Sequence, residues 1–174
     1  HRQDDPSTQI DSPKLGRPLP KTISVEDVDR LIRLAEEEAA NPRGSASART
    51  RRARFYALLE LLYATGLRVS ELLSLPKSAA RENGPFLTVI GKGSRERLVP
   101  LSKRARTAVI NYLALLKQTR GANSQTETVF LFPANSAKGH FSRQAFARDL
   151  KEFAGRAGLD ASKMSPHVLR HAFA

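Results

Sequence analysis

The sequence contains no cysteine. This absence excludes disulfide bonds, thiolate catalysis and zinc sites built from cysteine, and it is typical of a cytoplasmic protein. The chain also lacks an apolar run of the roughly 18 residues that a membrane span needs, and it carries no secretory signal. We therefore expect neither a disulfide-stapled secreted protein nor a membrane protein.

Acidic residues are few: 17 aspartates and glutamates face 29 lysines and arginines, which gives a formal net charge of +12. A domain this basic attracts polyanions, and nucleic acid is the most common of them. A solvated basic surface, a ribosomal protein or a protein of the membrane surface would carry the same excess. Hydrophobic residues make up 40% of the chain, which is enough for a folded core.

Residues 1–21 differ from the rest of the chain because they are polar, rich in proline and have little to bury. Such a segment is typical of a linker. The remaining residues, 22–174, are long enough for one domain. The chain starts at His1 rather than methionine and ends at Ala174 inside an apolar, helix-like stretch, so we expect both ends to continue in a longer protein.

Apolar periodicity predicts a mainly α-helical protein with one small antiparallel β-sheet, which is an α+β fold. Helices are expected over about 24–41, 51–64 and 69–75 and after the capping residues Ser102, Ser142 and Ser165, with a loop over 43–50. Residues 86–90 and 95–100 are expected to be strands. Gly91 to Ser94 would join them into a hairpin with Lys92 at its tip.

The first candidate residue is Arg68, in the segment Ala-Thr-Gly-Leu-Arg-Val-Ser-Glu-Leu over 64–72. It falls where one expected helix ends and the next begins. Exposed backbone N–H groups at such a junction, together with a guanidinium, favour a phosphate ligand. A solvated arginine paired with Glu71 is the alternative interpretation.

The second candidate is Lys92, between Gly91 and Gly93. Glycines let a backbone approach a ligand closely, and a lysine at a hairpin tip can reach into a cleft. An ordinary turn with a solvated lysine would have the same sequence.

The third candidate segment is Ser-Pro-His-Val-Leu-Arg-His over 165–171. His167 and Arg170 are three residues apart on an expected helix and therefore share a face. His171 is four residues from His167, so a zinc site is an alternative, with His140 or a distant acid as third ligand. The glutamate of the zinc-protease motif is missing, because Val168 stands there. We expect His171 to be hydrogen-bonded within the core instead.

In this order the three segments resemble the tyrosine recombinase (phage integrase) family, most closely its Xer-type bacterial members. Each segment alone is moderately specific, whereas their ordered combination in one basic chain is highly specific. The stretch Lys-Leu-Gly-Arg-Pro-Leu-Pro-Lys over 14–21 also looks like the linker that precedes the catalytic domain of that family. The resemblance covers about residues 14–174 and implies the fold of a recombinase catalytic domain, incomplete at its C-terminus.

The resemblance implies site-specific cleavage and rejoining of DNA through a tyrosine linked to a 3′-phosphate, with no metal, cofactor or external energy source. Its implied partners are double-stranded DNA and further protomers, as a tetramer on DNA. The matching catalytic positions are Arg68, Lys92, His167 and Arg170, and the matching supporting positions are Glu71 and His171.

The family places its nucleophilic tyrosine after the His-x-x-Arg helix, and no tyrosine follows Arg170 here. We expect Tyr56, Tyr63 and Tyr112, which all precede it, to lie in the core or at its edge. The resemblance therefore implies a fragment that is catalytically inactive by itself and binds DNA weakly.

Three alternatives remain open at this point. A type IB topoisomerase uses similar residues to relax DNA, although the Xer-like sequences of the motifs argue against it. A non-enzymatic DNA- or RNA-binding module would have the same basic surface with the candidate residues scattered over it. A metalloprotein would need a third ligand near the two histidines.

Overall fold

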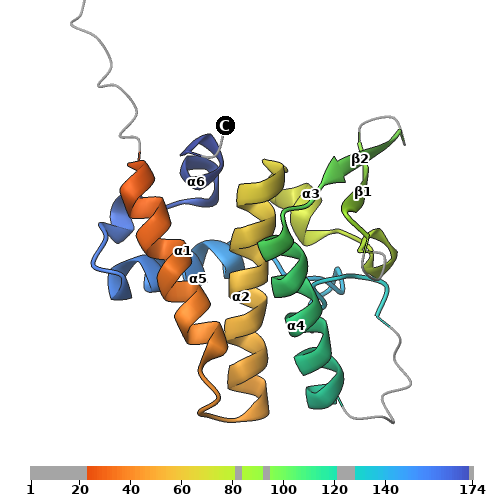
Figure 1. Ribbon diagram of the computed structural model, residues 1–174, viewed down its shortest axis with the longest axis horizontal. Helices are drawn as coiled ribbons and strands as arrows, with labels where there is room; N and C mark the ends of the chain where they lie inside the picture. The colour runs from red at the N-terminus through yellow and green to blue at the C-terminus, as the bar shows by residue number, and fades with distance from the viewer. Residues whose placement is uncertain (1–22, 81–83, 92–94, 121–127, 173–174) are drawn as a thin grey trace, which may run out of the picture.

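The computed structural model describes residues 23–80, 84–91, 95–120 and 128–172. Helices and one small sheet form within these ranges, as Figure 1 shows, so the expected mainly α-helical fold with an antiparallel sheet is confirmed. The expected linker over 1–21 lies outside the described residues. The helices and strands are α1 (Val25–Ala40), α2 (Ala46–Thr65), α3 (Val69–Leu73), β1 (Phe86–Ile90), β2 (Glu96–Pro100), α4 (Lys103–Arg120), α5 (Arg143–Arg156) and α6 (Pro166–Ala172).

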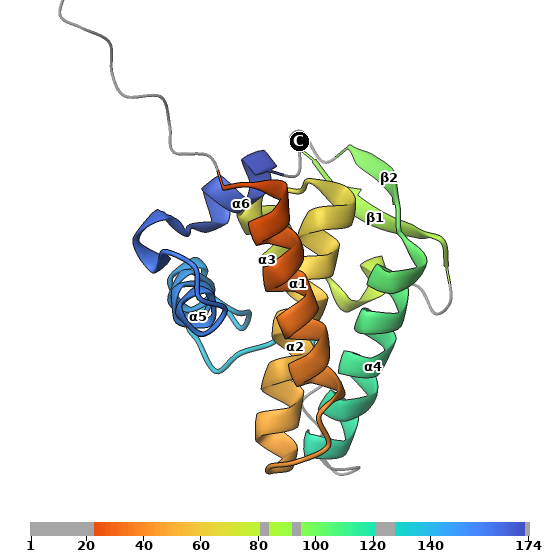
Figure 2. The ribbon, with the colours of Figure 1, turned by 60° about the vertical axis from the view of Figure 1, so that its left-hand side comes forward.

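Helix α2 is the centre of the molecule. Its middle turns are fully buried at Leu58, Leu59, Leu61 and Leu62. Helices α1 and α4 run beside it (Figure 1), and α5 covers another side, where Figure 2 shows it nearly end-on. The α5 side of the core is aromatic, because the Phe55 ring lies 4.6 Å from the Phe153 ring. No helix in the described part of the chain is both long and apolar enough to cross a membrane.

Serine caps set the start of several helices, as the sequence predicts. Ser24 accepts a hydrogen bond from the backbone N–H of Asp27, and Ser142 caps α5 in the same way. The expected loop over 43–50 is wrong for its second half, because Ser45 caps α2 and the helix begins at Ala46. Thr50 ties this first part of α2 to α4, since its hydroxyl lies 2.6 Å from that of Thr119. The contact between Thr50 and Thr119 thus favours a helix in a segment whose composition is typical of a loop.

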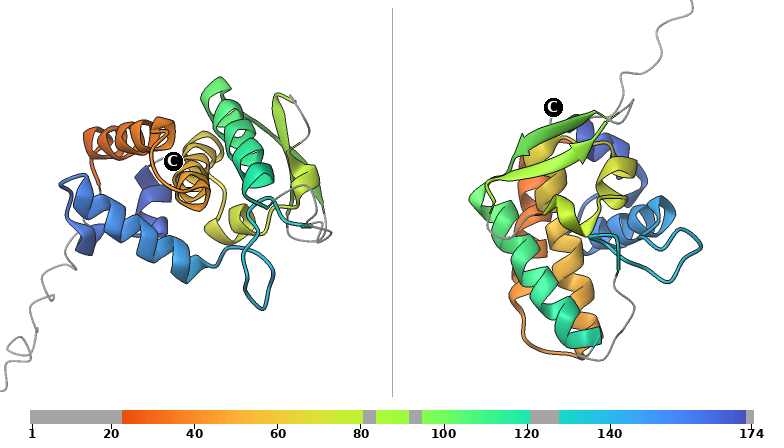
Figure 3. Two further views of the ribbon diagram at one scale, coloured as in Figure 1. Left: turned by 90° about the horizontal axis from the view of Figure 1, so that it is seen from below. Right: turned by 90° about the vertical axis from the view of Figure 1, so that its right-hand side faces the viewer.

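The two strands pair antiparallel, with Leu87 opposite Val99 and Val89 opposite Arg97. Paired residues share a face of the sheet. The face that carries Leu87 and Val89 lies against the core, because both side chains are almost fully buried. Strand β2 begins at Glu96, one residue later than expected. Figure 3 shows the hairpin from two further directions.

Helix α3 ends at Leu73, two residues earlier than expected, because the chain after it pairs with another segment. Lys77 N–H donates to the carbonyl of Val129 at 2.7 Å, and Leu131 N–H donates to the carbonyl of Leu75 at 2.8 Å. Residues 129–132 therefore run alongside residues 75–77, which follow α3.

A cluster of charged groups around one buried carboxylate joins α1, α2 and α4. Glu60 is 2% exposed, and Arg104 lies 3.3 Å from its carboxylate and 2.9 Å from that of Glu36. Burial raises the pKa of Glu60 above its usual 4.5, although the charge of Arg104 opposes the shift. Burial is also the main reason that the pKa of Tyr56, which donates to Glu36, is raised to about 12.

We predict that Glu60→Gln gains stability relative to the wild type as the pH rises above 4.5. A carboxyl whose pKa is raised by folding holds its proton longer in the folded state than in the unfolded chain. The wild type therefore loses stability as the pH climbs from the unfolded to the folded pKa, whereas glutamine does not titrate. Urea unfolding over a pH series measures the difference. Glu37→Gln, at an exposed position on the same helix as Glu36, controls for the loss of one carboxylate. A change in stability by Glu60→Gln that is the same at every pH would contradict the raised pKa of Glu60.

Candidate active site at the end of helix α2

The chain turns sharply at the C-terminal end of α2. Gly66 has φ 58° and ψ 21°, the left-handed conformation that glycine adopts most readily, and its N–H donates to the carbonyl of Leu62 at 2.9 Å. Leu67 is 1% exposed and anchors the turn in the core. The next residue, Arg68, precedes α3. Burial of Leu67 between two helix ends thus fixes where the Arg68 backbone lies.

The Arg68 side chain projects to the surface, with 66% of it exposed, and it contacts Glu71. Glu71 Oε2 accepts the backbone N–H of Arg68 at 2.9 Å, and Glu71 Oε1 lies 3.3 Å from Arg68 Nη1. The expectation that backbone N–H groups here could bind a phosphate is wrong for the N–H of Arg68 itself, because Glu71 occupies it. The guanidinium is the group that this junction presents to solvent.

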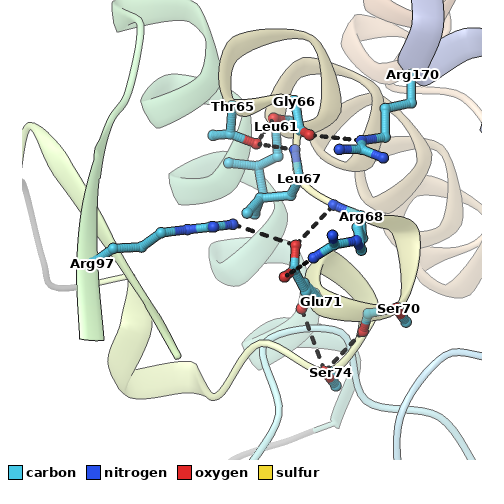
Figure 4. A network of polar contacts seen from close by, with 10 residues as sticks. All are labelled: Leu61, Thr65, Gly66, Leu67, Arg68, Ser70, Glu71, Ser74, Arg97 and Arg170. Carbon is cyan, nitrogen blue, oxygen red and sulfur yellow. Dashed lines mark hydrogen bonds and ion pairs between the residues drawn. The ribbon is translucent and has the colours of Figure 1, made fainter. Parts of the chain in front are cut away.

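Arg170 reaches the same turn from α6. Ser165 caps α6 by accepting from the N–H of Val168, as the sequence predicts, and Leu169 is fully buried. The side chain of Arg170 then donates from Nε to the carbonyl of Gly66 at 2.9 Å, across 104 residues of sequence (Figure 4). Two arginines from distant motifs are therefore held at one turn of the backbone.

His167 and His171 are exposed and lie on α6 together. Their Nε2 atoms are 2.9 Å apart, and their rings meet edge to face with centroids 4.3 Å apart. The expectation that His171 is bonded within the core is wrong. Leu169 is the residue of α6 that the core buries, and a residue two positions further on points to nearly the opposite side of a helix.

The two histidines have no third metal ligand among the described residues, where no group of three or more His, Cys, Asp or Glu side chains could hold a metal ion. His140, considered above as a third ligand, instead packs its ring 5.0 Å from Phe130 and bonds to the carbonyl of Phe141. The zinc interpretation therefore has no support from these parts of the chain.

Lys92 lies outside the described residues. The strand before it ends where expected, at Ile90, and the strand after it begins at Glu96, one residue late; Gly91 N–H donates to the carbonyl of Arg95 at 2.9 Å. Figures 1 and 2 place the hairpin, α3 and α6 at the same end of the molecule.

Arg97, which none of the three sequence segments includes, contacts Glu71 from β2. Arg97 Nη2 lies 3.4 Å from Glu71 Oε2, so one carboxylate meets two arginines (Figure 4). Strand alternation was the available signal. Leu87 and Val89 mark the inward face of the hairpin. Arg97 is a charged residue on the same face, because it pairs with Val89.

The tyrosines divide into two groups. Tyr56 and Tyr112 are buried, as expected, and burial raises the pKa of Tyr112 to about 12. Tyr63 of α2 is 51% exposed, so it does not belong to the core. Neither buried phenol is accessible to a large substrate.

Comparison with known proteins identifies the class of this fold. A family model described as the phage integrase family matches residues 21–174. The chain is 53% identical over 173 residues to a tyrosine recombinase XerD of Brucella suis biovar 1 (strain 1330), covering 99% of this chain and 55% of that protein.

Solved structures show the same likeness. The crystal structure of XerA recombinase aligns with a TM-score of 0.67 at 26% identity, over 94% of this chain and 50% of that one. XerH site-specific recombinase bound to difH substrate in a pre-cleavage complex also aligns with a TM-score of 0.67, over 89% of this chain and 42% of that one. At 24% identity the second likeness shows the fold alone.

The chain therefore belongs to the phage integrase family of tyrosine recombinases. Within that family it is similar to the Xer-type catalytic domain, which confirms the resemblance seen in the three motifs. It spans about half the length of the curated relatives that it matches.

We predict that Gly66→Ala destabilises the fold by about 1–2 kcal/mol, the cost of a side chain in the left-handed conformation. A Cβ at Gly66 would meet no atom within 4 Å, so backbone strain is the whole effect. Gly155→Ala in helix α5 is the matched control. It has equal space but no positive φ, and should stabilise by about 0.5–1 kcal/mol. Urea unfolding measures both, and equal effects would contradict the account of the turn.

Proposed function

We propose that the full-length protein containing this chain carries out site-specific DNA recombination by cleaving and rejoining strands through a 3′-phosphotyrosine. The observation that carries the proposal is the bond from Arg170 Nε to the carbonyl of Gly66, which sets the second arginine of the site beside the turn that carries the first. Family membership and the Xer-type relatives support the same reaction.

The proposed roles follow from the chemistry of a phosphodiester. Attack on phosphorus builds negative charge on the non-bridging oxygens, and the guanidinium groups of Arg68 and Arg170 would bracket them with forked donors. Lys92 would give a proton to the leaving 5′-oxygen, and His167 would assist proton transfer or hold the phosphate. A covalent phosphotyrosine conserves the energy of the broken ester, so rejoining needs no external energy source.

Glu71 and His171 have supporting roles in this proposal. Glu71 holds the backbone and guanidinium of Arg68, and His171 shares a hydrogen bond with His167. Neither would need to touch the phosphate. We also propose that residues 22–174 form the catalytic domain and that 1–21 form a linker.

Double-stranded DNA is the proposed partner. The net charge of +12 suits a polyanion, and the XerH relative is described in complex with its DNA substrate. Assembly of protomers into a tetramer on DNA belongs to the same proposal. The Xer-type likeness favours recombination over relaxation by a type IB topoisomerase, and dependence of cleavage on one specific DNA site would distinguish the two.

We predict that Arg68→Gln and Arg170→Gln each slow strand cleavage by the full-length protein by roughly 10²-fold or more, as loss of a donor to a developing oxyanion does. A suicide substrate that traps the covalent protein–DNA complex measures the rate on a denaturing gel. The isolated chain, with no tyrosine after Arg170, should form no such complex. Wild-type rates in both variants, or a covalent band from the isolated chain, would contradict the proposal.

The isolated chain should bind duplex DNA weakly, with little sequence preference and a strong dependence on salt, because contacts to phosphate dominate. Arg68→Gln should reduce the slope of log K against log salt by about 1, the share of one phosphate contact. Fluorescence anisotropy between about 50 and 300 mM salt measures the slope, and binding that stays constant over this range would contradict phosphate contact.

A further inference from the structure

Arg97 stands at an unusual position in its strand. It pairs with Val89, which is 1% exposed, so the side chains of both residues leave the hairpin on the face that packs on the core. A long charged side chain on such a face extends past the apolar surface until its guanidinium reaches solvent, where it can pair with an acidic group of a neighbouring element. Its side chain remains 50% exposed and extends from the strand towards Glu71 of α3 (Figure 4).

The partner is Glu71, whose side chain is 17% exposed. One of its oxygens, Oε2, meets both Arg97 Nη2 at 3.4 Å and the backbone N–H of Arg68 at 2.9 Å. The other oxygen, Oε1, meets Arg68 Nη1 at 3.3 Å. A continuous chain of polar contacts therefore runs from β2 through one carboxylate to both the backbone and the side chain of Arg68.

Two physical consequences follow for Arg68. Arg97 orders the Glu71 carboxylate before any substrate binds, so less side-chain entropy would remain to be lost when a phosphate arrives. Arg97 also shares the negative charge of Glu71. Without it, the carboxylate would attract the Arg68 guanidinium more strongly and compete with a phosphate for the same donors.

We propose that Arg97 is a positioning residue of the recombinase site: it fixes Glu71, keeps the Arg68 guanidinium available to the scissile phosphate, and ties the hairpin to the turn between α2 and α3. This inference rests on the function proposed above. Arg97 itself acts through Glu71 and does not contact the DNA phosphate.

The test uses the full-length protein with a suicide DNA substrate at saturating concentration. Arg97→Gln should slow single-turnover cleavage by roughly 10-fold while DNA affinity stays within about twofold, because a step after binding is affected. Arg97→Lys should recover most of the rate, since an ammonium can still pair with Glu71. Arg97→Met, which keeps the apolar stem, replaces the glutamine variant if that one does not fold.

A double-mutant cycle tests whether Arg97 acts through Glu71. The variant with both Glu71→Gln and Arg97→Gln should cleave no more slowly than Glu71→Gln alone, because the second change removes a contact already lost. Hydrogen exchange at the Arg68 amide gives a readout independent of activity. It should become several-fold faster in Arg97→Gln, while exchange at Gly66, which bonds to Leu62, stays unchanged.

The matched control is Arg156→Gln. Arg156 pairs with Glu38 at 2.7 Å with side-chain exposures of 50% and 23%, close to the 50% and 17% of Arg97 and Glu71. This pair joins α5 to the last turns of α1, away from the α2–α3 turn, and its loss should leave the cleavage rate unchanged.

The other outcomes separate the two proposals. Wild-type cleavage by Arg97→Gln, or an equal loss in Arg156→Gln, would overturn the role of Arg97. A weaker DNA affinity, a salt slope reduced by about 1 and additivity with Glu71→Gln would also overturn it, because Arg97 would then bind phosphate directly. Absence of cleavage by the wild type would overturn the proposed function itself.

Discussion

The site depends on one hydrogen bond, from the Nε of Arg170 to the carbonyl of Gly66. It joins α6 to a turn 104 residues earlier, and it uses a carbonyl that is available because Gly66 ends α2 in the left-handed conformation. A regular continuation of the helix would direct that carbonyl along the helix axis to a later N–H. The sharp end of α2 therefore creates both the place for Arg68 and the acceptor for Arg170.

The two arginines are oriented by different kinds of acceptor. Arg170 gives one N–H to a neutral carbonyl, and no carboxylate among the described residues forms an ion pair with it. Arg68 lies beside a full negative charge on Glu71, which Arg97 partly offsets. An incoming phosphate would thus meet the Arg170 guanidinium, whose charge no carboxylate offsets among the described residues. It would also meet the Arg68 guanidinium, which it would have to share with Glu71. Preorganised donors of this kind need little rearrangement when charge develops on a substrate.

Local signals in the sequence predicted the parts of the fold that local chemistry determines. The serine caps at Ser142 and Ser165 and the strand over 86–90 lie where expected. Tertiary contacts decided the rest. The start of α2 is held by Thr50 against α4, and the pairing of Arg97 with Glu71 joins a strand to a helix that it does not adjoin in sequence. The exposure of His171 follows from which side of α6 meets the core, a choice that the motif alone does not contain.

Helix α6 is short and depends on tertiary contacts for its stability. It has seven residues, too few for an isolated helix to be stable, and Leu169 is its buried residue within the described chain. Burying one leucine contributes about 1.5–3 kcal/mol, and the bond from Arg170 adds about 1 kcal/mol. A phosphate held between Arg68 and Arg170 would bridge α6 and the central helix, so binding it would stabilise the docked position of α6. Under the proposed function, a bound phosphate would in this way help to complete the arrangement of side chains around it.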